Sequence, residues 1–212
     1  LRSSTQAEYC RLDRLYIRPR LGSHQVVQVA TNDVARLHAE LRDRPVQANR
    51  TLALLSKFFN WCERNELRAN NSNPCRHIDK YEESSRERYL STDETARLLD
   101  ASQLAEDNYT ASPWAIGALR LLLFTGARLS EILKLRWDWI DWERRVLRLP
   151  VHKARNKGSK TIILNEQALS VLQAIPRQGD NPHVICGEKT GSHLVNLQKP
   201  WRRIRKIAKL DD

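Results

Sequence analysis

The chain has 212 residues, 41% of them hydrophobic, which is enough for one large or two small folded domains and argues against disorder. Its 36 basic and 25 acidic residues give a net charge of +11, which favours a polyanion such as nucleic acid over a merely solvated basic surface. The four cysteines lack zinc-site spacing, and no stretch is apolar enough to cross a membrane, so we expect reduced thiols, no metal and no membrane partner.

Three helices are predicted in the first third of the chain. The first runs from Ser4 to Tyr16 and ends at Pro19 and Gly22, and the second covers residues 34–41 after capping side chains. The third covers residues 46–65 and has one apolar face. Its polar face carries two candidate DNA-binding residues, which could lie along a phosphate backbone: Arg50 and Lys57.

Residues 67–87 are polar and rich in turn formers, which predicts a linker and two domains, 1–83 and 84–212. Both domains are basic, with 14 basic and 10 acidic residues up to residue 83 and 22 and 15 after it. Both could therefore contact the same anion.

The second domain opens with a capping sequence at Ser91–Glu94 and continues into an apolar run that Gly126 ends. A short amphipathic helix follows, and Arg128 lies at the junction between the two helices. A guanidinium there can donate two parallel hydrogen bonds to a phosphate, although an arginine at a helix boundary often only caps a carboxylate or carbonyl. The second helix is too apolar to be a DNA-reading helix.

A β-hairpin is predicted from residues 146–149 and 161–164, followed by a helix at 166–175, a short strand at 183–185 and a last helix near 199–209. Three tryptophans after the Arg128 helix are expected to pack on the core rather than to stack on DNA. The hairpin tip and the last helix supply the other basic candidates for DNA contacts: Lys157, Lys160, Arg202 and Arg203.

The segment Thr125–Trp137, with its Gly-Ala-Arg-Leu-Ser-Glu order and the basic hairpin behind it, resembles the first catalytic box of the tyrosine recombinases, or phage-type integrases. The resemblance implies a mainly α fold with a small antiparallel β-sheet. Residues 1–83 would be a helical, SAM-like core-binding domain, and residues 84–212 a truncated α+β catalytic domain. It also implies attack by a tyrosine on a DNA phosphodiester, with a 3′-phosphotyrosyl intermediate and neither cofactor nor metal.

By this resemblance, Arg128 is the catalytic arginine that holds the scissile phosphate, and Glu131 is the acidic residue beside it. A hairpin lysine is the proton donor to the leaving 5′-oxygen, and Lys153, Lys157 and Lys160 all lie on the tip. Lys153 is our choice, because His152-Lys-Ala resembles the family motif at the end of the first hairpin strand, whereas Lys160 resembles the residue that begins the returning strand. The second box and the tyrosine nucleophile of the family are not found after Arg128. His152 and Arg155 spell His-x-x-Arg, but in the hairpin instead of a later helix.

The resemblance further implies double-stranded DNA as partner, a homo-tetramer on DNA, accessory DNA-bending proteins and a bacterial cytoplasmic, nucleoid-associated location. The chain begins with Leu and is expected to be an excerpt of a longer recombinase. Two alternatives stay open: a non-catalytic, sequence-specific DNA-binding protein derived from an integrase, and an unrelated basic helical scaffold for RNA or protein. A downstream His-x-x-Arg and tyrosine in the parent reading frame would favour the enzyme.

Overall fold

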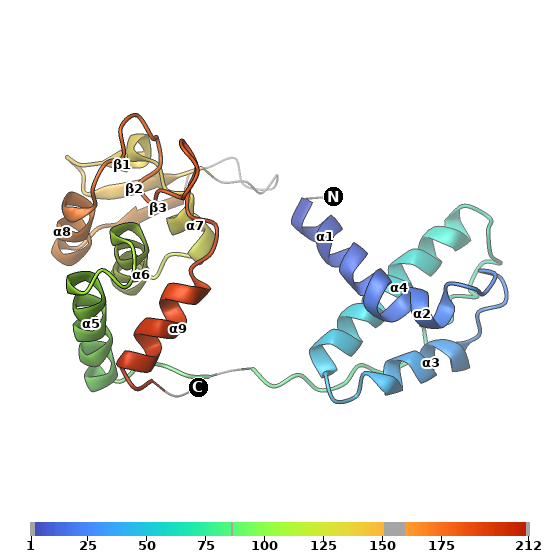
Figure 1. Cartoon of the computed structure of the whole chain (residues 1–212). Coiled ribbons are helices and arrows are strands. Elements are labelled where there is room, and N and C mark those ends of the chain that lie inside the picture. Colours follow the sequence, from blue (N-terminus) through green and yellow to red (C-terminus); the bar gives the residue numbers. More distant parts are fainter. Residues whose placement is uncertain (1–2, 86, 151–159, 211–212) are drawn as a thin grey trace. The chain divides into compact units, whose positions relative to one another are not determined.

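The computed structural model describes residues 3–85, 87–150 and 160–210 (Figure 1). The chain divides into two compact units, Leu1–Glu87 and Arg88–Asp212, close to the boundary after residue 83 that the sequence predicts. Helices predominate, and one small antiparallel sheet lies in unit 2. The predicted fold class is thus confirmed.

Unit 1 consists of helices joined by short loops. Pro19 does not end the first helical segment as predicted; it lies near the start of α2, in a backbone that stays helical from α1 through the π-helical turn. Pro45 likewise begins a helix. The elements are α1 Ser3–Leu12, the π-helical turn Asp13–Ile17, α2 Arg18–Leu21, α3 Thr31–Glu40 and α4 Pro45–Arg64.

Helix α4 provides much of the core of unit 1, with Leu52, Leu55 and Phe59 buried against α3 and the loops. Much of the segment predicted as a linker also packs on this unit. Arg68 donates to the backbone oxygens of Val26 and Val29. Farther along, the Asn49 side chain on α4 donates to the Tyr81 carbonyl oxygen at 2.8 Å. The same Asn49 group donates to Glu83 Oε1 at 2.7 Å, so the attachment to unit 1 extends to residue 83.

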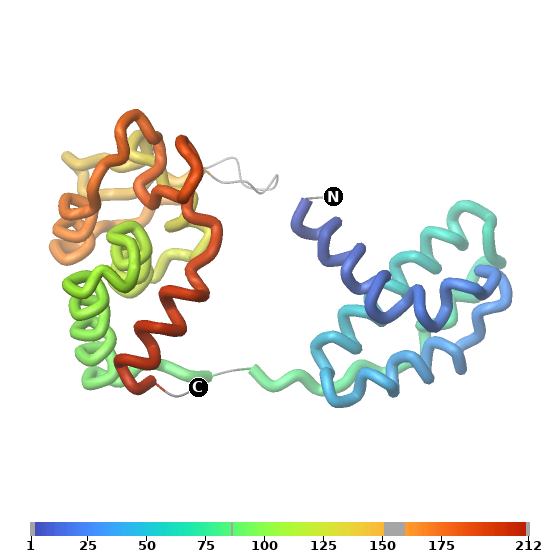
Figure 2. Tube along the Cα trace, in the orientation of Figure 1, coloured from blue at the N-terminus to red at the C-terminus, as the bar shows by residue number. Residues whose placement is uncertain are grey.

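Unit 2 is built around α6, whose alanine, isoleucine and leucine side chains are buried among the other helices. Helices α5 and α9, the first and last of the unit, lie side by side although they are far apart in sequence (Figure 2). The elements are α5 Thr92–Asp107, α6 Pro113–Thr125, α7 Leu129–Leu133, the 3-10 turn Trp137–Trp139, β1 Ile140–Asp141, β2 Val146–Leu149, β3 Lys160–Ile163, α8 Glu166–Ala174 and α9 Gln198–Ile207.

The sheet has the order β1-β2-β3, with both pairs antiparallel. The predicted hairpin is β2 and β3, in which Leu147 faces Ile162 and Leu149 faces Lys160. The prediction of a short strand at 183–185 is wrong. Within the described residues this region forms only isolated β-bridges, one of them between Arg136 and His183, and no adjacent residue pair extends either bridge into a strand.

The tryptophans after α7 pack largely as predicted. Trp137 and Trp139 are partly buried against the core of unit 2, whereas Trp142 is 40% exposed. No helix among the described residues has both the length and the apolar character needed to cross a bilayer.

Candidate functional site

The turn between α6 and α7 is held by hydrogen bonds within the chain. Gly126 has a left-handed φ of +61°, and its amide donates to the Leu122 carbonyl oxygen at 3.1 Å. The Thr125 hydroxyl accepts from the Ala127 amide at 3.3 Å and donates to the Leu121 carbonyl oxygen. The chain thus leaves α6 in a fixed direction and brings the next residue, Arg128, to the N-cap position of α7.

Glu131, in the first turn of α7, joins three groups of this site. Its carboxylate accepts from the Arg128 backbone amide at 2.9 Å, from Arg128 Nη1 at 3.3 Å and from Lys160 Nζ at 2.7 Å. Burial on its own raises the pKa of the Glu131 carboxyl, but the hydrogen bonds from Lys160 and the Arg128 amide, with the two positive charges, outweigh it, so the pKa lies below 4.5. Glu131 is therefore ionised at neutral pH.

The Arg128 side chain is 76% exposed although Glu131 contacts it. A guanidinium has five N–H donors, and the structure gives only Nη1 a partner among the described residues. The other donors face solvent from a turn of fixed geometry. Such an arrangement can receive an oxyanion with little reorganisation, which is the physical requirement for stabilising charge on a phosphate.

Of the three hairpin lysines, only Lys160 is among the described residues, and it lies at this turn. Lys160 begins β3, and its bond to Glu131 ties the base of the hairpin to α7. Lys153 and Lys157, with His152 and Arg155, fall in residues 151–159, outside the described residues. Sequence reasoning missed the Lys160–Glu131 pair, because no local motif indicates a contact between residues 29 positions apart.

Helix α9 presents basic side chains opposite its buried face. Ile204 is fully buried and Trp201 packs on the same small core, whereas the other side of the helix is exposed. One predicted residue there is engaged: Arg203 donates to the Thr110 carbonyl oxygen. Arg202 is exposed and keeps its charge at the surface, in line with two lysines at helical spacing, Lys199 and Lys206.

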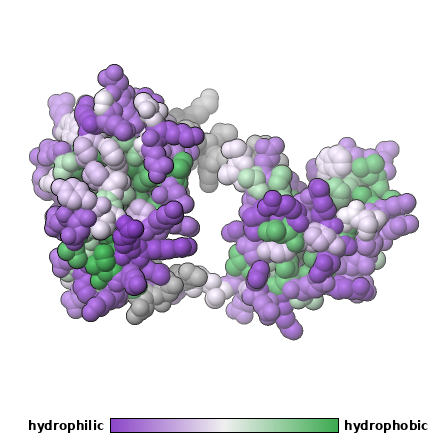
Figure 3. All heavy atoms as spheres, in the orientation of Figure 1, coloured by the Kyte–Doolittle hydropathy of each residue, from purple (hydrophilic) through white to green (hydrophobic). Residues whose placement is uncertain are grey.

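Helix α4 carries a second row of basic residues, spaced seven apart on its solvent face: Arg50, Lys57 and Arg64. Arg50 lies 3.9 Å from a Glu8 carboxylate oxygen, and Lys57 Nζ lies 5.2 Å from the centre of the Tyr9 ring. Lys57 Nζ also donates to the Tyr9 hydroxyl at 3.4 Å, yet both Arg50 and Lys57 remain exposed. Hydrophilic residues cover much of the visible surface of each unit in Figure 3.

A hollow of about 480 Å³ in unit 2 lies apart from the Arg128 turn. Leucines from α5, α6 and α7 form much of its wall, and neither Arg128 nor Glu131 lines it. Among the described residues, no group of three or more histidine, cysteine or acidic side chains is arranged to hold a metal ion. The candidate site is therefore the exposed turn at Arg128, with the basic helix faces as candidate contact surfaces.

Comparison with known sequences identifies the protein family of the region that contains this turn. Residues 88–212 match the phage integrase family. The chain belongs to this family. The resemblance carried by Thr125–Trp137 is thereby confirmed, and Arg128 lies within the matched region of this integrase.

Two curated relatives come from Escherichia coli. The integrase is 26% identical over 174 residues to prophage integrase IntZ of strain K12, which covers 80% of this chain and 42% of the relative. It is 35% identical over 193 residues to a shufflon-specific DNA recombinase, covering 88% of this chain and 46% of the relative. The chain thus spans less than half the length of both relatives.

Solved structures share the fold over the whole chain. The Tn1549 transposon integrase (residues 82–397) in complex with circular intermediate DNA has a TM-score of 0.74 and 19% identity, covering 100% of this chain and 75% of that one. A lambda integrase (75–356) dimer bound to a COC′ core site has a TM-score of 0.79 and 16% identity, with 100% and 74% covered. At such identities the likeness concerns the fold.

Proposed function

We propose that this integrase chain is the DNA-binding and phosphate-holding part of a site-specific recombinase, which breaks and rejoins DNA through a 3′-phosphotyrosyl intermediate. The observation that carries the proposal is the Arg128 turn: within the family region, an ionised carboxylate holds the backbone of an arginine whose guanidinium is exposed. Its chemistry is that of a preorganised donor to a phosphate that gains negative charge in the transition state.

In this mechanism Arg128 neutralises the non-bridging oxygens of the scissile phosphate, and Glu131 holds the Arg128 backbone and the start of α7 in place while it contacts the guanidinium. A hairpin lysine protonates the leaving 5′-oxygen. The Lys160 ammonium is already engaged by Glu131 at 2.7 Å, which makes it a positioning group. This pairing supports the assignment of the proton donor to the hairpin tip, where Lys153 is our choice and Lys157 the other candidate.

The nucleophile is proposed to lie outside residues 1–212. All five tyrosines, Tyr9, Tyr16, Tyr81, Tyr89 and Tyr109, precede Arg128, whereas the family order places the nucleophile after it. Residues 1–212 on their own are therefore expected to bind DNA without cleaving it. This tyrosine order also supports the second candidate function, a non-catalytic DNA-binding protein derived from an integrase.

The proposed partner is double-stranded DNA, contacted by the basic faces of α4 and α9 in the two units. The candidate residues are Arg50 and Lys57 on α4, Arg202 on α9, and the hairpin lysines. A homo-tetramer on DNA, with accessory DNA-bending proteins, completes the proposal. It is supported by a fold neighbour, lambda integrase, whose structure is a tetramer bound to a Holliday junction.

A substrate with a 5′-bridging sulfur at the scissile phosphate tests this mechanism in a protein that carries this chain together with its tyrosine segment. The sulfur leaves as a thiolate without needing a proton, so it should restore cleavage to Lys153→Ala and not to Arg128→Ala. With the ordinary substrate, Arg128→Ala should cleave about a hundred- to a thousandfold more slowly.

The same substrate distinguishes the candidate proton donors. Rescue of Lys157→Ala in place of Lys153→Ala would identify Lys157 as the proton donor. Rescue of none of the lysine variants would place it elsewhere. If the protein with its tyrosine segment forms no covalent adduct on a suicide substrate that carries its site, the recombinase proposal fails in favour of the non-catalytic binder.

A further inference from the structure

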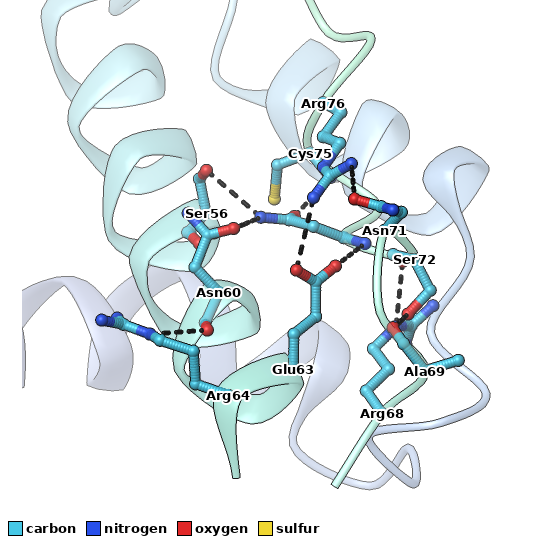
Figure 4. A network of polar contacts seen from close by, with 11 residues as sticks. Ser56, Asn60, Glu63, Arg64, Arg68, Ala69, Asn71, Ser72, Cys75 and Arg76 are labelled. Carbon is cyan, nitrogen blue, oxygen red and sulfur yellow. Dashed lines mark hydrogen bonds and ion pairs between the residues drawn. The ribbon is translucent and has the colours of Figure 1, made fainter. Parts of the chain in front are cut away.

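The Asn60 side chain on α4 is held in one orientation by a buried neighbour. Asn73, in the loop after α4, is only 5% exposed, and its Oδ1 accepts from the Cys75 amide at 2.9 Å. The Asn73 Nδ2 group therefore points to α4, where it donates to Asn60 Oδ1 at 2.8 Å and to the Ser56 carbonyl oxygen at 3.1 Å. Figure 4 shows this network between Ser56, Asn60 and Cys75.

The backbone of Asn73 is fixed by the same network. Its amide donates to Glu63 Oε1 at 2.6 Å, and the other Glu63 oxygen is paired with Arg76 at 3.3 Å. Reversing the Asn73 amide would place its Nδ2 against the Cys75 N–H and lose both contacts to α4. The acceptor role of Asn60 Oδ1 is therefore determined by the surrounding structure.

Because Oδ1 faces Asn73, the Nδ2 group of Asn60 is turned away from it. Asn60 is exposed, and Nδ2 has no hydrogen-bond partner among the described residues. A free asparagine can pair with an adenine edge through both its oxygen and its nitrogen. Asn60 instead offers donors with its oxygen already engaged, a combination that suits a lone acceptor such as a phosphate oxygen.

The surroundings of Asn60 favour an anion. It lines a groove of about 380 Å³ between α4 and the segment that follows, and the lining residues include three cations, Lys57, Arg64 and Lys80. The groove walls, as the structure describes them, include no carboxylate. A polar hollow with this charge attracts phosphate, and a neutral donor within it adds direction to the attraction.

We propose that Asn60 donates a hydrogen bond to a phosphate oxygen of duplex DNA seated at this groove, and that Asn73 is its positioning residue. The inference rests on the proposed DNA-binding function and adds to it a sequence-independent contact in unit 1. Such a contact sets how the duplex sits on the protein without reading its bases.

The test measures binding of residues 1–212 to three unrelated duplexes by fluorescence anisotropy. Asn60→Ala should weaken binding about fivefold, and Asn60→Asp at least tenfold, because a carboxylate oxygen then faces the phosphate. Asn70→Asp is the matched control, since it adds the same charge at an exposed position of the turn after α4. It should weaken binding by about twofold.

The loss for Asn60→Ala should be the same on all three duplexes. A loss that differs between sequences would show a base-edge acceptor and overturn the phosphate assignment. Equal affinities for Asn60→Asp and Asn70→Asp would overturn the contact itself while leaving DNA binding intact. If the unaltered chain fails to bind any duplex, the proposed function and this inference both fail.

The role of Asn73 is tested with Asn73→Asp, which replaces the donor facing Asn60 Oδ1 by an acceptor and so favours reversal of the Asn60 amide. DNA binding should weaken in Asn73→Asp, and the same substitution should have little further effect in the Asn60→Ala background. Additive losses in the double variant would mean that Asn73 is merely structural. Circular dichroism of each variant checks that the chain is folded. If Asn73→Asp does not fold, the Asn60 variants alone decide the proposal.

Discussion

Glu131 offers a quantitative test of how the Arg128 turn is held. Its bond to the Arg128 amide begins α7 and should contribute about 1 kcal/mol. The pair with Lys160, whose side chain is 40% exposed, should add about 0.5 kcal/mol, and the pair with the mostly exposed Arg128 guanidinium close to nothing. Glu131→Ala should therefore cost about 1.5 kcal/mol, and Glu131→Gln, which can still accept from the amide, about 0.5 kcal/mol.

Thermal unfolding followed by tryptophan fluorescence measures these losses, because five of the six tryptophans lie in unit 2. For a unit of this size, the melting temperature should fall by about 6 °C for Glu131→Ala and about 2 °C for Glu131→Gln. Glu143→Gln is the matched control. Glu143 is exposed and has no hydrogen bond or ion pair with the described residues, so this variant should melt like the unaltered chain.

The pKa of Glu131 also fixes the direction of a pH effect. A carboxyl whose pKa is lowered on folding stabilises the fold above its unfolded value of about 4.5, and this contribution is lost as the pH falls through the folded value. The difference between Glu131→Gln and the unaltered chain should thus be full at pH 7 and fade below about pH 4.5. If Glu131→Ala melts no lower than Glu143→Gln at pH 7, the carboxylate does not hold the turn.

Two further predictions concern other parts of the chain. Gly126→Ala should destabilise unit 2 by about 1 kcal/mol in thermal unfolding, because the added Cβ meets open space and only the left-handed backbone conformation disfavours alanine. A loss of stability above about 3 kcal/mol would show that the turn is packed more tightly than this. A thiol reagent should modify the exposed Cys10 first in the native protein. Burial raises the pKa of the Cys75 thiol to about 12 and also raises the pKa values of Cys62 and Cys186, so these thiols should react more slowly. Faster labelling of Cys75 than of Cys10 would contradict this order.

Features that depend on neighbours in sequence were predictable. The Ser91 hydroxyl accepts from the Glu94 amide at 3.2 Å, and the Glu94 carboxylate accepts from the Ser91 amide at 2.9 Å, as the capping sequence indicates. Gly126 ends α6 in the left-handed conformation that only glycine adopts without strain. Arg128 therefore lies at the predicted helix junction, because both flanking signals are local.

Features that depend on the surrounding structure could not be predicted from the sequence. Pro19 carries the same sequence signal whether the helix ends there or continues, and the backbone in fact stays helical through the π-helical turn into α2. Neither the pairing of Lys160 with Glu131 nor the buried donor role of Asn73 follows from sequence spacing. The basic residues of α4 and α9 were identifiable by charge, but the engagement of Arg203 by the Thr110 carbonyl oxygen was not.

The salt dependence of duplex binding tests the central claim most directly, because phosphate contacts release counterions in proportion to their number. If residues 1–212 neutralise about six phosphates, the logarithm of the association constant should fall with the logarithm of salt concentration at a slope near −5. Lys57→Ala together with Arg202→Ala should reduce that slope by about 2. A slope near zero, or tighter binding to single-stranded RNA than to duplex DNA, would contradict the account.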